Sequence, residues 1–172
     1  MNPTSLAESV RLAASLQAWL GLRLSFVDRD ADQITELVTG AVVDWGRDSG
    51  WRVYRKARSV FPLPPPYQDR HSFVDVGIAR AGAAPIVVEV DRSDRKRTLE
   101  KLAAEAAAGR VALWVRWGTG PFTEPMPPVL LVPFAVEARR GRVYSTPIAG
   151  PPAPEHSAVD VTEGEQAELF GE

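Results

Sequence analysis

Three acidic residues stand in segments that are otherwise rich in Val and Ile. Asp75 lies within residues 73–77 (FVDVG), and Glu89 and Asp91 lie within residues 86–91 (IVVEVD). Alternate residues of a β-strand project to the same face, so Glu89 and Asp91 are expected to lie side by side. A hairpin between the two segments would bring Asp75 next to Glu89. The spacing therefore predicts a group of carboxylates at the end of a buried strand.

Carboxylates inside such strands need a cation, a proton or hydrogen bonds to compensate their desolvation. Magnesium takes oxygen ligands in octahedral geometry and keeps part of its water. Asp75, Glu89 and the carbonyl of Val90 are thus the expected ligands of Mg²⁺ or Mn²⁺, together with a phosphate oxygen. The alternative is that these acids lie at strand ends, where they contact water or pair with arginine.

A basic segment follows the acidic strand. Residues 92–101 (RSDRKRTLEK) include five basic and two acidic residues. Basic side chains beside a metal site would neutralise phosphates and give affinity independent of sequence. A solvated first helical turn is the alternative, although three basic residues there oppose the helix dipole. The predicted DNA contacts are Arg92, Arg95, Arg97 and Lys101, with Lys56 from an earlier strand.

The amino-acid composition excludes several classes of protein and of metal site. The chain has 172 residues, of which 45% are hydrophobic and 24% charged, values typical of a globular domain. Cysteine is absent and there are two histidines, which excludes thiolate zinc sites and a His-built metal centre. No apolar run approaches the roughly 20 residues needed to cross a bilayer, so a cytoplasmic protein without a membrane partner is expected.

The elements that must position these residues can be read from periodicity and turn signals. Helices are predicted over 5–20, 32–49 and 95–108, and strands over 51–57, 72–79, 86–91, 111–117, 129–132 and 142–145. The strand, helix, strand order after residue 86 implies a right-handed crossover between parallel strands. The expected fold is α/β, with a mixed central sheet flanked by helices.

Two regions differ in charge. Residues 1–154 contain 20 basic and 16 acidic residues, whereas residues 155–172 contain six acidic and no basic residues. A basic body is compatible with a polyanionic partner. We predict one α/β domain over residues 1–146 and a Pro-rich, acidic, disordered tail over 147–172.

Three of the acidic positions resemble a known superfamily. Glu36 in the 32–49 helix, Asp75, and Glu89 before a basic helix look like the acidic elements of the PD-(D/E)XK nuclease-like fold. The predicted αβββαβ order, from about residue 32 to 117, is similar to its restriction-endonuclease-like core. The resemblance implies a metal-dependent DNA nuclease, in which Asp75 and Glu89 bind the ion and Glu36 assists.

The sequence departs from that superfamily at one position. Where its usual Lys follows the acid by two residues, this chain has Asp91. The resemblance then assigns the role of that Lys to Lys96 or Lys101, with Arg92 another candidate. The departure also fits a degenerate member that acts as a DNA-binding or adaptor protein without cutting DNA. The predicted catalytic set is Asp75, Glu89, Asp91, Lys96 and Glu36, although Glu36 lies almost opposite the apolar stripe of its helix.

The tail contains a second resemblance. Residues 166–170 (QAELF) look like the Q-x-x-L-F pentapeptide by which bacterial replication and repair proteins dock on the DNA sliding clamp. Leu169 and Phe170 would enter an apolar pocket and Gln166 would form hydrogen bonds at its rim. The alternative is that Leu169 and Phe170 fold back onto their own domain. The predicted function is a DNA endo- or exonuclease of bacterial repair or replication, tethered to the clamp, and a dimer is compatible with the sequence.

Overall fold

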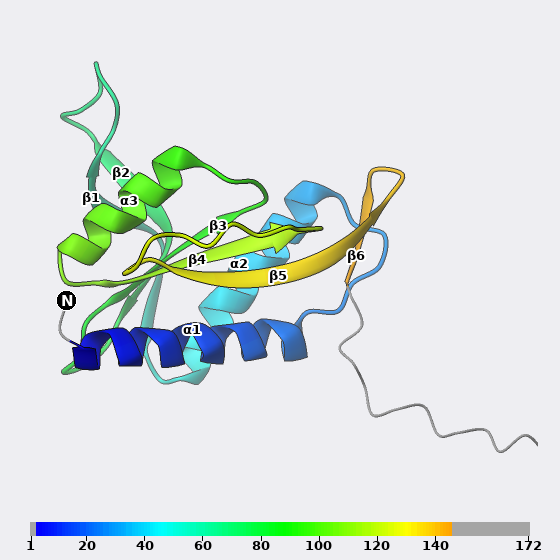
Figure 1. Cartoon of the computed structure of the whole chain (residues 1–172), viewed down its shortest axis with the longest axis horizontal. Helices are drawn as coiled ribbons and strands as arrows, with labels where there is room; N and C mark the ends of the chain where they lie inside the picture. Colours follow the sequence, from blue (N-terminus) through cyan, green and yellow to red (C-terminus); the bar gives the residue numbers. More distant parts are fainter. Residues whose placement is uncertain (1–2, 146–172) are drawn as a thin grey trace, which may run out of the picture.

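Six strands form one mixed sheet in a computed structural model that describes residues 3–145 (Figure 1). The strands follow one another across the sheet in chain order, and β3, β4 and β5 are mutually parallel while the other neighbours are antiparallel. The predicted α/β class with a mixed sheet is therefore confirmed. The elements are α1 (Pro3–Arg23), α2 (Ala31–Asp48), β1 (Arg52–Pro62), β2 (His71–Ala79), β3 (Ile86–Asp91), α3 (Lys96–Ala107), β4 (Val111–Gly118), β5 (Leu130–Arg139) and β6 (Arg142–Ser145).

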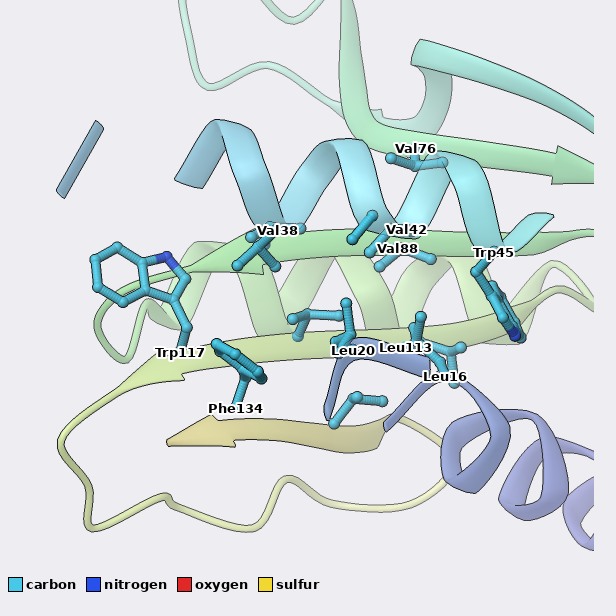
Figure 2. Close-up of a cluster of buried hydrophobic side chains, with 14 of the residues drawn as sticks. Leu16, Leu20, Val38, Val42, Trp45, Val76, Val88, Leu113, Trp117 and Phe134 are labelled. Carbon is cyan, nitrogen blue, oxygen red and sulfur yellow. The ribbon is translucent and has the colours of Figure 1, made fainter. Parts of the chain in front are cut away.

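Helices cover both faces of the sheet. The larger core lies under α1 and α2, where apolar side chains from both helices meet those of the central strands, as Figure 2 shows. The smaller core lies under α3 and includes Val74, Val87, Leu102 and Trp114. Because α3 packs on the face opposite α2, a side chain of the sheet can face only one of these two helices.

The periodicity of α2 explains why it forms where it does. Ile34, Val38 and Val42 are fully buried, in agreement with the predicted amphipathic stripe. The Asp30 carboxylate accepts a hydrogen bond from the Gln33 N–H at 2.8 Å, and the Gln33 side chain accepts from the Asp30 N–H at 3.1 Å. This capping box starts the helix at Ala31.

The other boundaries differ modestly from the predictions. α1 begins at Pro3, before the predicted start at residue 5, because proline needs no hydrogen-bond acceptor for its nitrogen in a first turn. It runs past Gly21 to Arg23. β1 and β5 are longer than predicted, since pairing with β2 extends β1 to Pro62 and pairing with β6 extends β5 to Arg139.

None of the helices within residues 3–145 is long and apolar enough to cross a membrane. The predicted tail, with Gln166, Leu169 and Phe170, lies outside the described residues.

Candidate active site

Asp75 lies where the pairing of β2 and β3 ends. The register of this pair covers Val76–Ile78 and Ile86–Val88. Beyond it, the backbone N–H of Val90 donates to Asp75 Oδ2 at 2.9 Å. The Asp75 carboxylate thus binds the backbone of β3 directly and lies next to the position of Glu89.

The alternation of side chains along β2 is interrupted at this point. A regular alternation over the predicted strand 72–79 would place Val74, Val76 and Ile78 on one face, but Val76 and Ile78 face α1 and α2 whereas Val74 packs under α3. Opposite this point in the paired strand, Lys56 has a φ of +54° between residues that pair with Val74 and Val76. A non-glycine residue in this left-handed region marks an irregularity that interrupts the alternation of side chains.

The carboxyl groups of Asp75 and Glu89 lie close enough that each shifts the pKa of the other. Each also has its own ammonium partner: Lys56 Nζ lies 2.8 Å from Asp75 Oδ1, and Lys101 Nζ contacts Glu89 Oε1. Glu89 is 6% exposed. Two acids from neighbouring strands therefore meet in a largely desolvated place, as the sequence predicted.

Their pKa values move apart. Burial, and then the adjacent Asp75, raise the pKa of Glu89 to about 8, against the opposing effect of Lys101. Burial also opposes ionisation of Asp75, but hydrogen bonds from Glu89, Lys56 and the Val90 N–H outweigh it and lower the pKa of Asp75. The hydrogen bond to Asp75 raises the pKa of Lys56. At neutral pH the pair therefore shares one proton, which Glu89 holds.

The acid pair opens into a cavity of about 280 Å³. Asp91 lies in its wall, where it accepts a hydrogen bond from Trp114 Nε1 at 3.0 Å and approaches Arg95 Nε at 3.5 Å. Four basic side chains surround three carboxyl groups in this space. The lining residues are Lys56, Phe73, Asp75, Glu89, Asp91, Arg95, Arg97, Thr98 and Lys101.

Two predicted catalytic residues lie elsewhere. The Glu36 side chain is 71% exposed and pairs with Arg55 at 2.9 Å, on the α2 side of the sheet. It lines a larger hollow of about 830 Å³ beside α1 and α2, which does not contain the acid pair. Lys96 is 91% exposed and faces Glu100 at 3.7 Å. Neither residue belongs to the lining of the smaller cavity.

Arg92, a predicted DNA contact, is also outside that cavity. Its guanidinium lies 5.6 Å from the centre of the Trp117 ring, in a separate hollow shared with Arg116. Among the two lysines that the resemblance offered on α3, the structure brings Lys101 to the carboxylates.

Sequence reasoning missed Glu105, which is fully buried on α3. It accepts hydrogen bonds from the Ser59 hydroxyl, from the Val60 N–H at 2.8 Å and from Arg110. Its burial could have been predicted from its position. It lies seven residues after Thr98 and three after Leu102, which places it on the buried stripe of the helix. Phe73 was also missed as a lining residue, although it was expected on the same face as Asp75.

The residues present fit a hard divalent ion. The N–H and C=O groups of one strand residue point to the same side, so the Val90 carbonyl faces β2 as its N–H does. Asp75, Glu89 and this carbonyl supply oxygen donors beside a water-accessible space, which is the chemistry that Mg²⁺ and Mn²⁺ prefer. Within residues 3–145 no set of three or more His, Cys, Asp and Glu side chains is arranged around one metal position. The remaining ligands would therefore be water or phosphate.

Comparison with protein-family models, with curated proteins and with solved structures gives no match. The resemblance to the PD-(D/E)XK superfamily thus remains a prediction from the sequence.

Proposed function

We propose that this protein is a metal-dependent DNA nuclease of the PD-(D/E)XK kind, with its active site in the cavity at the ends of β2 and β3. One observation supports this most: Asp75 and Glu89, from neighbouring strands, line one cavity beside the ammonium of Lys101. Acids that lie against each other in a desolvated place cost free energy in a structural role, so their contact favours a functional one.

Each residue has a role in this proposal. Asp75, Glu89 and the Val90 carbonyl would hold Mg²⁺ or Mn²⁺. When bound, the ion supplies Lewis acidity toward the phosphodiester and its attacking water. Lys101, reaching the acids from α3, would stabilise negative charge that develops on the phosphate oxygens. It takes the place of the strand Lys for which this chain has Asp91.

The basic wall would hold the DNA backbone. Arg95 and Arg97 line the same cavity as the acid pair and can contact phosphates on either side of the reacting one. Asp91, held by Trp114 and Arg95, would keep Arg95 oriented.

Incubation of the purified protein with Mg²⁺ or Mn²⁺ and either supercoiled plasmid or single-stranded circular DNA tests the proposal. We expect cleavage of at least one of the two forms, which disappears in Asp75→Ala and in Glu89→Ala. Cleavage that both variants retain would place the activity elsewhere, and DNA that stays intact in both forms would contradict a nuclease.

A specific observation favours a second function, a catalytically degenerate DNA-binding or adaptor protein. Asp75 and Glu89 already have cationic partners within the protein, Lys56 and Lys101. Such a protein would leave the plasmid intact at every divalent ion concentration while binding DNA with an affinity that falls as salt rises.

For the tail we propose docking on a bacterial sliding clamp in the cytoplasm, during DNA repair or replication. The support is the spacing of Gln166, Leu169 and Phe170. Deletion of residues 166–172 is expected to abolish clamp binding in fluorescence anisotropy. Unchanged binding would discard this partner.

A further inference from the structure

Phe73 is a partly exposed aromatic residue at the cavity. It is 45% exposed and lines the same space as Asp75 and Glu89. Within residues 3–145 its ring has no stacking or cation–π partner. Lys101 donates to the Phe73 carbonyl at 2.7 Å and also contacts Glu89, so the aromatic residue is linked to the acid pair by one ammonium.

The chain around Phe73 forms an arm that projects past the sheet (Figure 1). This arm comprises residues 60–73, the end of β1, the following loop and the start of β2. Arg97 fastens it to α3, because its guanidinium donates to the Pro62 carbonyl at 2.7 Å and lies 4.8 Å from the centre of the Phe61 ring. The wall that contains Phe73 is thus attached beside the cavity.

The arm carries a second exposed aromatic residue, which lies beside the one arginine of the arm. Tyr67, which is 51% exposed, lies under the guanidinium of Arg70 at 5.1 Å. Phe73 and the basic lining of the cavity follow farther along. Such a surface offers ring faces for bases and positive charge for phosphates, the combination with which proteins bind single strands.

An intact duplex cannot use these ring faces. Its bases are stacked on one another, and exposing one costs unpairing and unstacking free energy. In a single strand the face of each base is available for stacking. The aromatic wall therefore distinguishes the two forms of DNA, which the phosphate contacts alone do not.

We propose that Phe73 stacks on the nucleobase adjacent to the phosphodiester at Asp75 and Glu89, so that the site acts on single-stranded DNA. This inference rests on the proposed nuclease function. It adds a substrate class and a specificity residue to that function.

Two labelled probes with equal phosphate charge separate stacking from electrostatics. One is a thymidine 12-mer, and the other is a 12-mer of abasic deoxyribose phosphates. Binding is measured by anisotropy in EDTA, where cleavage is prevented. Phe73→Ala is expected to weaken thymidine binding by about 5- to 100-fold, the range for one lost stacking contact, and to leave abasic binding unchanged.

Matched variants control for bulk and for fold. Phe73→Leu keeps an apolar side chain without a ring face and should lose affinity as Phe73→Ala does, whereas Phe73→Trp should retain it. Tyr54→Ala removes an aromatic residue of similar exposure, 48%, from β1 outside this cavity and should change neither probe.

The outcomes distinguish the two proposals. Equal weakening of both probes by Phe73→Ala, no weakening of either, or wild-type binding of a duplex as tight as that of the thymidine strand would overturn stacking. If stacking is seen but neither single strand nor duplex is cut with Mn²⁺, the nuclease proposal fails while the single-strand contact stands. Failure to bind either probe would overturn both.

Discussion

Two buried glutamates, Glu105 on α3 and Glu89 on β3, have opposite surroundings. Glu105 is fully buried, and donors from its own fold occupy its oxygens: the Ser59 hydroxyl, the Val60 N–H and the Arg110 guanidinium. Glu89 instead faces a second carboxyl group, Asp75, and a cavity. Burial of an acid is therefore no sign of function in itself. An acid that lies against another acid and lines a cavity does indicate function, because such a contact costs free energy in a purely structural role.

The largest expected effect concerns stability. Glu105→Ala leaves the Arg110 charge and the Ser59 and Val60 donors without their partner, which should lower the free energy of unfolding by about 3–5 kcal/mol. Glu89→Gln replaces a group that is protonated at neutral pH by an uncharged one of similar size and should change it by less than about 1 kcal/mol. Urea unfolding at pH 7 measures both.

Glu105→Gln is the control, since it retains the size of the side chain and an acceptor for Val60. Glu105→Gln should lower the free energy of unfolding by more than Glu89→Gln and by less than Glu105→Ala. Equal losses in Glu105→Ala and Glu89→Gln would show that the two glutamates do not differ as described.

The next effect separates the two lysines of α3. Lys101 contacts Glu89, whereas Lys96 is solvated. Lys101→Met should reduce cleavage of single-stranded DNA by about 10²- to 10³-fold, as loss of one charge-stabilising group does in other enzymes. Lys96→Met should retain the wild-type rate. The reverse order would return the catalytic role to Lys96.

A further effect is that the stability of the folded protein changes with pH. The pKa of Glu89 is about 8 in the folded protein against an ordinary value of 4.5, so the folded state binds the proton more tightly. Its contribution to stability is therefore present below about pH 4.5 and is lost as the pH rises toward 8. Asp75, whose pKa is lowered, contributes oppositely: its stabilisation is present above its ordinary pKa of 3.8 and is lost as the pH falls below that value.

Thermal unfolding in EDTA between pH 5 and pH 8 reveals this dependence on pH. The stability of Glu89→Gln relative to wild type should rise across the interval, because the variant has no carboxyl group at this position to ionise. A difference that stays constant would mean that Glu89 ionises at its ordinary pKa.

The local parts of the site were predictable from the sequence. A period of two placed Glu89 and Asp91 on one face, and the hairpin placed Asp75 beside them, because both follow from strand geometry. The amphipathic helix α2 and the crossover through α3 were also predictable, because they follow from hydrophobic periodicity and from the order of the elements.

What depends on packing was not predictable. Opposite Lys56, which has a positive φ, the side chains of β2 change the face to which they point, and no residue type in the sequence predicts this change. The choice of Lys101 over Lys96 depends on which side of α3 meets the sheet, which Leu102 and its neighbours decide by burial. Glu105 lies at a position of the buried α3 stripe that is normally apolar. Because its side chain is charged, the sequence did not indicate that it would be buried there.

Direct titration with Mn²⁺ by isothermal calorimetry tests the central claim, that Asp75 and Glu89 form one site for a divalent ion. We expect saturable binding by the wild type, loss of binding in Asp75→Asn and in Glu89→Gln, and wild-type affinity in Glu36→Gln, whose side chain lies apart from the cavity. Equal Mn²⁺ affinity in the wild type and in the two site variants, or no binding by the wild type, would contradict the account.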